Sequence, residues 1–403
     1  MRVLHVIVTM ARGYGGPVAA CDAYCQHLVA MGHQVTVFTT DMPWPPGPER
    51  DGPLGRTVTR AGYDIVRFHA LERFVAWAPA LWRALDARML ETDIVHIHGS
   101  YRFPGYAAAV LARRHGVPFI MCPHGSLLPY GRNQPHSRWR KRIYEQLFEF
   151  PNLRRAAAVQ FTAEDERLLT KPLGFDAKAV VIPCAVETGE AVDPCRFEPP
   201  RSAAPADGPT IVFMGRLAKK KNAEVAIEAL PQVLRTFPGA RLVVAGPDDE
   251  GLRPGLEAIA ARLAVADRVV FPGMVGGQAK ERLLRDGDVF VLPSHSENFG
   301  IAVIEAMAAG LPTIVTRGVA IWREVEESGG GLVVDNSAQA LSEGIIRILS
   351  EPDLASRRAA AIAFANRFTG PRVTEQLVDV YRRVIAERDD RTIDRDCGRI
   401  TSG

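Results

Sequence analysis

Short apolar runs alternate with amphipathic stretches along the chain, and this alternation starts twice, at residue 3 and again at residue 210. The apolar runs have the length of strands, and the stretches between them have the periodicity of helices. Strands that are apolar on both faces and alternate with helices are typical of parallel sheets covered on both sides. The pattern therefore predicts an α/β protein with two doubly wound, Rossmann-like domains.

The first series predicts a helix at residues 17–31 and strands at 3–9, 34–39, 63–68, 94–98, 119–123, 158–162 and 180–182. The second series predicts helices at 223–236 and 256–264 and strands at 210–214, 241–245, 268–271, 289–292, 313–315 and 331–334. Three amphipathic helices then follow, at 341–349, 358–367 and 372–388.

The alternation of apolar runs and amphipathic stretches is absent between the two series, where proline, alanine and small polar residues dominate. This break predicts a first domain at 1–187, a linker at 188–209 and a second domain at 210–370. The helix at 372–388 is expected to pack back on the first domain, and the polar residues 389–403 to form a flexible tail. Because doubly wound sheets bind ligands at the carboxyl ends of their strands, we expect the two domains to face a central cleft.

Composition changes this picture little. A chain of 403 residues with a net charge of +3 argues against a dedicated nucleic-acid binder, and no apolar run reaches the length of a membrane span. The six cysteines form no Cys-x-x-Cys pair, and Cys21 and Cys25 are interpreted as small packing residues rather than metal ligands. We therefore expect a protein of the reducing cytoplasm.

The segment from Pro293 to Met307 carries the strongest chemical signal. Glu297 falls on the loop after an expected strand, and Glu305 falls on the helix that opens near Gly300. The N–H groups of Phe299, Gly300 and Ile301 are expected to point out of the helix start, where partial positive charge suits a phosphate.

This segment resembles the Glu-x7-Glu motif of the family 4 retaining glycosyltransferases, which have the GT-B fold. The resemblance implies a nucleoside-diphosphate-sugar donor, with Glu297 as a catalytic residue at the donor sugar and Glu305 on the ribose hydroxyls. Read alone, two glutamates eight positions apart could equally be a loop carboxylate and a solvated helix residue. Their place between a strand and a glycine-started helix favours the functional interpretation.

A cationic segment, Phe213 to Asn222, follows the first strand of the second series. It resembles the Gly-Arg-Leu…Lys-Gly signature of the same family, which implies that Arg216 and Lys221 bind the donor pyrophosphate. Arginine and lysine at a strand end can neutralise such a group. Asn222 stands where glycine is common, and the adjacent Lys220 competes with Lys221 for the role.

Breakage of the anomeric C–O bond leaves negative charge on the diphosphate, and fixed cations can stabilise that charge. The resemblance implies that this happens without a metal and without any other cofactor, the nucleotide sugar being a co-substrate. The sequence Asp286-Gly287-Asp288 matches an Asp-x-Asp metal motif by letter. Because it precedes a buried strand, we interpret it as a turn.

The loop Gly13-Tyr14-Gly15-Gly16-Pro17 follows the first strand and lacks the spacing of a dinucleotide fingerprint. In the resembled family such a loop approaches the donor phosphates, so Gly15 and Gly16 are assigned to donor binding. A tight turn would also require glycine.

Two histidine motifs end first-domain strands, His96-Ile97-His98-Gly99 and His124-Gly125-Ser126. By resemblance His124 is a second catalytic candidate beside the reacting sugar, and His98 and Ser126 are candidates for the acceptor side. For His98 a structural role is as well supported as a functional one. His5 and His33 are interpreted as structural.

Residues Arg138 to Phe148 form a basic aromatic stretch in which Glu145 is the first acidic residue. Such a helix can lie on an anionic membrane, which would suit a lipid-linked sugar acceptor and a peripheral place on the inner face of the plasma membrane. It can equally be an amphipathic helix packed on the domain with solvated arginines.

Together these features predict a retaining, metal-independent hexosyltransferase that moves sugar from a nucleotide-diphosphate-sugar to a carbohydrate or lipid-linked acceptor hydroxyl, with the leaving phosphate taking the acceptor proton. Cell-surface polysaccharide or glycolipid synthesis is the expected setting. The alternatives are a nucleotide-sugar epimerase or a pyridoxal-phosphate phosphorylase on the same fold, and a non-catalytic protein that binds nucleotide sugars.

Overall fold

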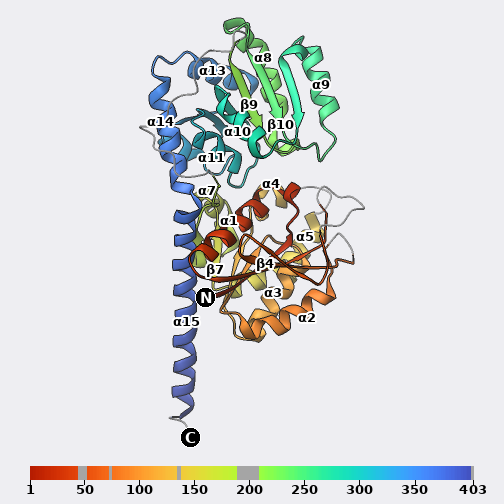
Figure 1. Ribbon diagram of the computed structural model, residues 1–403, viewed down its shortest axis with the longest axis vertical. Coiled ribbons are helices and arrows are strands. Elements are labelled where there is room, and N and C mark those ends of the chain that lie inside the picture. Colours follow the sequence, from red (N-terminus) through yellow and green to blue (C-terminus); the bar gives the residue numbers. More distant parts are fainter. Residues whose placement is uncertain (44–51, 72–74, 134–137, 188–207, 401–403) are drawn as a thin grey trace. The chain divides into compact units, whose positions relative to one another are not determined.

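The computed structural model describes residues 1–43, 52–71, 75–133, 138–187 and 208–400 (Figure 1). The chain divides into two compact units, one made of Met1–Ala185 with Gly370–Gly403 and the other of Val186–Thr369. Each unit has one sheet of mainly parallel strands with helices packed against it, which confirms the predicted fold class. The predicted linker at 188–209 lies outside the described residues except for its last two positions.

The sheet of the first unit has eight strands in the order β3-β4-β2-β1-β5-β6-β7-β8. Their bounds are β1 (Arg2–Thr9), β2 (Gln34–Thr40), β3 (Thr57–Arg60), β4 (Tyr63–Phe68), β5 (Ile94–His98), β6 (Phe119–Cys122), β7 (Ala158–Phe161) and β8 (Ala179–Val181). Strand β3 is antiparallel to β4 and the other neighbouring pairs are parallel. The sequence analysis missed β3 because this short, polar edge strand has no apolar run.

Helices cover both faces of this sheet. Their bounds are α1 (Gly16–Ala30), α2 (Pro79–Arg88), α3 (Phe103–Arg114), α4 (Pro129–Arg132), α5 (Arg138–Tyr144), the π-helix η4 (Glu145–Glu149), α6 (Phe150–Arg155), α7 (Glu164–Thr170) and α15 (Gly370–Ile400). Leu4 and Val6 of β1 pack in an apolar core with α2, α3 and α6. Because side chains alternate along a strand, His5 lies on the opposite face of β1.

The last helix, α15, belongs to the first unit, and Figure 1 shows it as one long blue rod. It contacts α1, and the Tyr381 hydroxyl lies 2.7 Å from Nδ1 of His96 on β5. The sequence predicted a helix at 372–388 and a polar tail from residue 389, but the backbone stays helical to Ile400. The polarity of this segment suggested a frayed end, yet it contains no proline that would stop a helix.

The second unit has six parallel strands in the order β11-β10-β9-β12-β13-β14. Their bounds are β9 (Thr210–Met214), β10 (Arg241–Ala245), β11 (Val269–Gly273), β12 (Val289–Leu292), β13 (Thr313–Thr316) and β14 (Gly331–Val334). In chain order the strands run 3-2-1-4-5-6, so the winding reverses between β9 and β12. In sheets of this kind, ligands bind outside the carboxyl ends of the strands at the reversal.

The helices of the second unit are α8 (Ala223–Thr236), α9 (Arg253–Arg262), α10 (Gly277–Arg285), α11 (Ile301–Ala308), α12 (Trp322–Glu327), α13 (Ala338–Leu349) and α14 (Leu354–Ala365). The motif Asp286-Gly287-Asp288 lies in the turn between α10 and β12, as predicted. There the Asp288 carboxylate accepts a hydrogen bond from the backbone N–H of Thr210 at 2.8 Å, which ties the turn to the start of β9.

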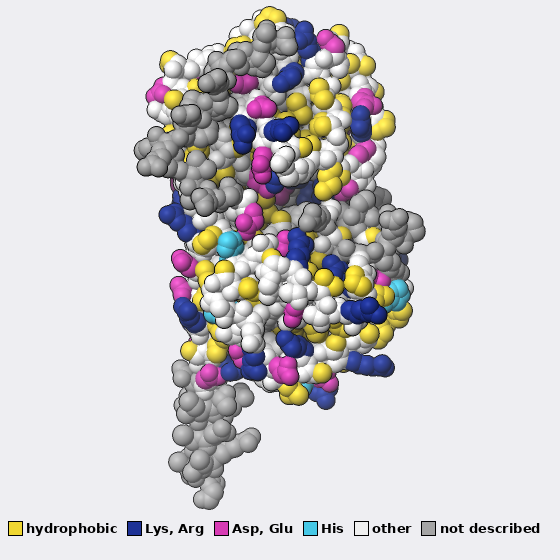
Figure 2. Space-filling model, in the orientation of Figure 1, with side chains coloured by type: hydrophobic (Ala, Val, Ile, Leu, Met, Phe, Trp, Pro, Cys, Tyr) yellow, Lys and Arg dark blue, Asp and Glu magenta, His cyan; other side chains and the backbone are white. Residues whose placement is uncertain are grey.

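Charged side chains of both signs are interspersed over the face of the molecule in Figure 2. Among the described residues, no helix is both long enough and apolar enough to span a membrane.

Candidate functional site

The reversal point of the second sheet brings together residues from two segments far apart in the sequence. Arg216 and Lys221 follow β9, whereas Glu297 follows β12. The Lys221 ammonium forms an ion pair with the Glu297 carboxylate, and the two side chains are only 12% and 14% exposed. Arg216 lies beside them and contacts Asp249 at 3.4 Å. The structure therefore groups three of the predicted donor-site residues at one edge of the sheet.

Backbone-to-backbone packing holds the loops of this edge in place. A Cβ atom on Gly246, after β10, would lie 1.9 Å from the carbonyl oxygen of Gly215, after β9. A Cβ atom on Gly318, after β13, would lie 2.1 Å from the carbonyl oxygen of Ser294, after β12. Only glycine permits these approaches. The loops that carry Arg216 and Glu297 are thus each pressed against a neighbouring loop.

The charges of this edge act on one another. Burial raises the pKa of the Glu297 carboxyl, but the positive charges of Lys221, Lys220 and Arg216 outweigh that effect and hold the pKa below its usual value. Burial lowers the pKa of Lys220, with Lys221 and Arg216 adding to the effect and Glu297 opposing it. Glu297 is therefore ionised at neutral pH, and the positive charges of Lys221, Lys220 and Arg216 all act on it. Such an edge suits an anionic ligand.

Helix α11 starts beside Glu297. Its N-cap is Gly300, with φ 85° and ψ 56° in the left-handed region. A Cβ atom there would lie 3.2 Å from Val303 Cγ2 and 3.3 Å from Val319 Cγ1, so the position is both strained and crowded for any other residue. Phe299 is buried against Phe368, with ring centroids 5.5 Å apart, and the half-buried Ile301 opens the helix. The N–H groups of a first helical turn have no partner within the helix and are available to a phosphate.

Glu305 lies one turn into α11 and is paired rather than solvated. Its carboxylate is 2.7 Å from the ammonium of Lys280 on α10, and its side chain is 18% exposed. Sequence reasoning missed Lys280 because only the packing of α10 beside α11 brings the two residues together. A ribose at Glu305 would share the carboxylate with this lysine.

Asn222 has φ 55° and ψ 44° and forms the N-cap of α8. Asparagine is among the few residues other than glycine that adopt the left-handed region readily. The asparagine that replaces the glycine common in the resembled family is therefore suited to the left-handed conformation at this position.

The first unit has its own reversal point, between β1 and β5. Gly15 follows β1 with φ 86°, and Gly16 is the first residue of α1. His98 is the last residue of β5, next to this turn in the sheet order. The structure thus places three predicted residues at the carboxyl edge of the first sheet.

His124, Gly125 and Ser126 form the turn after β6. His124 has φ 50° and Gly125 has φ 76°, so two consecutive residues are left-handed. For His124 this conformation costs about 1 kcal/mol. Strain of this kind persists only where the surroundings enforce it, and it is common at functional sites.

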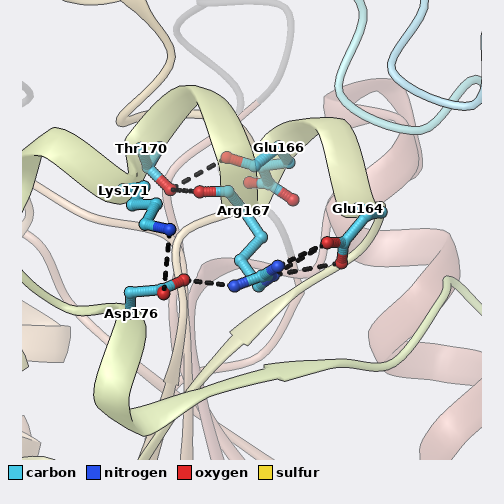
Figure 3. A network of polar contacts seen from close by, with 6 residues as sticks. All are labelled: Glu164, Glu166, Arg167, Thr170, Lys171 and Asp176. Carbon is cyan, nitrogen blue, oxygen red and sulfur yellow. Dashed lines mark hydrogen bonds and ion pairs between the residues drawn. The ribbon is translucent and has the colours of Figure 1, made fainter.

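Glu166 is the buried residue that enforces this turn. Its carboxylate accepts hydrogen bonds from the Gly125 N–H at 2.8 Å and from the Thr162 N–H at 2.7 Å. Arg167, next to it on α7, is paired with Glu164 and with Asp176, which fixes the helix (Figure 3). Sequence reasoning missed Glu166. The signal was present as a run of acids at the start of a helix after a strand.

Burial acts on the two predicted histidines of the first unit, His98 and His124. Burial lowers the pKa of His98 well below its usual value and lowers the pKa of His124 to about 4. Nδ1 of His98 lies 2.9 Å from Nε2 of His124. At neutral pH His124 is therefore a neutral hydrogen-bonding group and not a cation.

A second polar cluster joins the loop after β5 to the π-helix η4. The Tyr101 hydroxyl donates to Glu145 at 2.7 Å, Arg132 pairs with the same carboxylate at 2.7 Å, and the Tyr101 N–H donates to Glu149 at 3.2 Å. Burial raises the pKa of Glu149 to about 7, although the hydrogen bonds from Tyr101 and Ser100 oppose it. π-Helices are rare and are frequent at functional sites.

The raised pKa of Glu149 should make the stability of the fold depend on pH. Between its usual pKa near 4.5 and about 7, Glu149 binds more protons in the folded chain than in the unfolded chain. The free energy of unfolding should therefore fall as pH rises through this window, by up to about 3 kcal/mol from this group. We expect Glu149→Gln, which cannot ionise, to flatten the pH dependence measured by urea unfolding. An unchanged slope would contradict this, and exposed Glu228→Gln is the control.

Two family models match the two units. The model described as "Glycosyl transferase 4-like domain" matches residues 15–185, and the one described as "Glycosyl transferases group 1" matches residues 196–364. The D-inositol 3-phosphate glycosyltransferase of Acidothermus cellulolyticus is 30% identical over 317 residues, which cover 73% of this chain and 68% of that protein. The chain belongs to the family 4 glycosyltransferases.

Another relative of this glycosyltransferase matches it almost from end to end. The GDP-mannose:cellobiosyl-diphosphopolyprenol alpha-mannosyltransferase of Xanthomonas campestris is 26% identical over 394 residues, 96% of this chain and 97% of that one. Among solved structures, sucrose-phosphate synthase from Thermosynechococcus elongatus superposes with a TM-score of 0.77 at 21% identity, covering 96% of this glycosyltransferase and 100% of that chain. The fold is GT-B, as the sequence resemblance implied.

Proposed function

We propose that this glycosyltransferase transfers a hexose from a nucleoside-diphosphate-sugar to an acceptor hydroxyl with retention of anomeric configuration. The observation that carries the proposal is the largely buried Lys221–Glu297 ion pair at the reversal point of the second sheet, with Arg216 beside it. A carboxylate for the sugar and two cations for the pyrophosphate are what this donor requires at neighbouring positions.

Each residue then has a role in the donor complex. Arg216 and Lys221 neutralise the diphosphate as the anomeric C–O bond breaks, and the N–H groups of Phe299, Gly300 and Ile301 receive its oxygens. Glu297 contacts the sugar, and Glu305 binds the ribose hydroxyls. Gly15 and Gly16 approach the phosphates, and His124 donates to a sugar hydroxyl. No side-chain base is assigned, and the leaving phosphate takes the acceptor proton.

We propose that no metal ion and no further cofactor takes part. The support is the group of three cations, Lys221, Lys220 and Arg216, whose charges act on Glu297 and can stabilise the leaving diphosphate. Loss of activity after dialysis against a chelator, with recovery on adding Mg²⁺, would refute this part of the proposal.

For the acceptor we propose a sugar carried on a membrane lipid, in surface polysaccharide or glycolipid synthesis, with Ser126 on the acceptor side. His98, the other candidate from the sequence, is buried and both of its ring nitrogens contact other histidines, so it is not assigned to the acceptor. The nearly full-length relative is named for a diphosphopolyprenol acceptor. Trp139, Ile143 and Leu147, spaced four apart along α5 and η4, are 63%, 51% and 63% exposed, and Arg140 and Arg142 are exposed beside them. An apolar stripe flanked by arginines suits the surface of an anionic membrane. Sedimentation with phosphatidylglycerol vesicles tests this contact.

A donor screen tests the central proposal. UDP-, GDP-, ADP- and CMP-sugars are added to the protein and the melting temperature is followed, because binding to the folded state raises it. Donors that bind are then incubated with and without acceptor. Turnover of donor alone into an epimer would replace the proposal with the epimerase alternative, and the absence of any binding would favour a non-catalytic protein.

Arg216→Ala is expected to weaken binding of the nucleoside diphosphate about tenfold, because one charge-assisted contact to the pyrophosphate is lost. Isothermal titration calorimetry with the matching diphosphate measures the change. Arg235→Ala, an exposed arginine near the end of α8, is the control and should bind as the unaltered protein does. Equal affinity in both variants would remove Arg216 from the donor site.

A further inference from the structure

Three histidines of the first unit, His5, His98 and His124, form a continuous hydrogen-bonded chain, which we call the histidine row. Nδ1 of His5 lies 2.8 Å from Nε2 of His98, and Nδ1 of His98 lies 2.9 Å from Nε2 of His124. Neighbouring rings are stacked with interplanar angles of 18° and 17°. The row crosses three adjacent elements, from the middle of β1 through the end of β5 to the turn after β6.

The row constrains where each ring carries its hydrogen. A nitrogen–nitrogen contact of this length needs one N–H and one lone pair, and a neutral imidazole has one of each. His98 must therefore accept from one neighbour and donate to the other. Only two arrangements are consistent with neutral rings: all hydrogens point from His5 toward His124, or all point the opposite way.

The inner end of the row favours the first arrangement. Nε2 of His5 is buried and has no hydrogen-bond partner among the described residues. In the reversed arrangement this atom would carry a buried, unpaired N–H, which is rarer in proteins than an under-used acceptor.

We propose that His5 and His98 are positioning residues that hold His124 as the tautomer with its hydrogen on Nδ1. Nε2 of His124 is occupied by His98, so Nδ1 is the nitrogen left for a ligand. The proposal rests on the proposed function in one respect: the hydroxyl that this N–H meets is one on the donor sugar. It also revises the sequence interpretation of His5 as simply structural.

The tautomer can be observed directly in the unaltered protein. Long-range ¹H–¹⁵N correlation spectra of ¹⁵N-histidine-labelled protein distinguish a protonated ring nitrogen from an unprotonated one, and single histidine variants assign the signals. We expect His98 and His124 to be protonated at Nδ1 and unprotonated at Nε2 at neutral pH. Protonation of His124 at Nε2 would overturn the proposal.

Substitution within the row then tests its effect on transfer. His98→Phe removes both contacts, so the His124 signals should change to those of mixed tautomers and kcat/KM should fall about tenfold, the value of one hydrogen bond to the sugar. His98→Gln, which can still accept and donate, should recover part of the loss. Unchanged His124 signals in His98→Phe would show that the row does not set the tautomer.

His96→Phe is the matched control. His96 lies on the same strand and the same face, is equally buried, and bonds Tyr381 instead of the row. The His96→Phe variant should leave the His124 tautomer unchanged. An equal change in His96→Phe and His98→Phe would indicate a general packing effect and count against the proposal. The spectra need no turnover, so a protein that transfers no sugar would refute the proposed function while leaving the tautomer result intact.

Discussion

Glu297→Gln is expected to lower kcat for sugar transfer about a thousandfold while the protein stays folded. The substitution removes the carboxylate that we place at the donor sugar, and loss of one such electrostatic contact typically costs two to three orders of magnitude. It keeps the size of the side chain, and the neighbouring Lys221 keeps a hydrogen-bond acceptor. Steady-state kinetics with the donor found in the thermal-shift screen measures the effect.

The same substitution should not weaken binding of the nucleoside diphosphate. Lys221, Lys220 and Arg216 then face one carboxylate fewer, so their field on an anion becomes stronger. A large fall in kcat with unchanged or tighter diphosphate binding is the expected signature. Turnover near that of the unaltered enzyme would show that Glu297 has no catalytic role. Glu257→Gln, half-exposed in an ion pair on α9, is the control.

Gly246→Ala is expected to destabilise the second unit by about 4 kcal/mol, a loss near the upper end for a single substitution. Gly246 has φ 146°, and its Cβ atom would lie 1.9 Å from the Gly215 carbonyl oxygen. Either the backbone of Gly246 or the loop carrying Arg216 must move. The melting temperature of this unit should fall by about 10 °C, measured by calorimetry with and without donor.

Gly251→Ala provides the matched control for this prediction. Gly251 lies in the same loop and is also left-handed, with φ 67°, but nothing lies within 4 Å of its Cβ position. Alanine there should cost only the backbone strain, about 1 kcal/mol. Similar losses in both variants would show that contact with Gly215 is not the cause.

Much of the fold follows from the sequence because parallel strands covered on both faces read as continuous apolar runs. The order of the strands, and hence the reversal between β9 and β12, follows from the fold class once two doubly wound domains are recognised. Glu297 and Arg216 could be placed at the same sheet edge for this reason. Their proximity is local to the ends of neighbouring strands and needs no knowledge of side-chain packing.

Other parts of the site depend on packing that no local pattern encodes. The pairing of Lys280 with Glu305 depends on how α10 lies against α11, and the support of Gly125 by Glu166 depends on where α7 starts. Lys220 and Lys221 lie next to each other in a 3₁₀ turn and point in different directions, and only the folded structure shows that Lys221 is the one paired with Glu297. The apolar pattern did not predict strand β3, because an edge strand with one partner strand needs little apolar surface.

The two ends of the second unit lie next to each other. The second unit begins at Val186 and ends at Thr369, and these two residues pair side by side, with the Val186 N–H 2.9 Å from the carbonyl oxygen of Phe368. The whole second unit is therefore an insertion whose two ends lie side by side. A gene fragment spanning it should yield an autonomous module, and the host unit could be rejoined by a short peptide bridge across the gap.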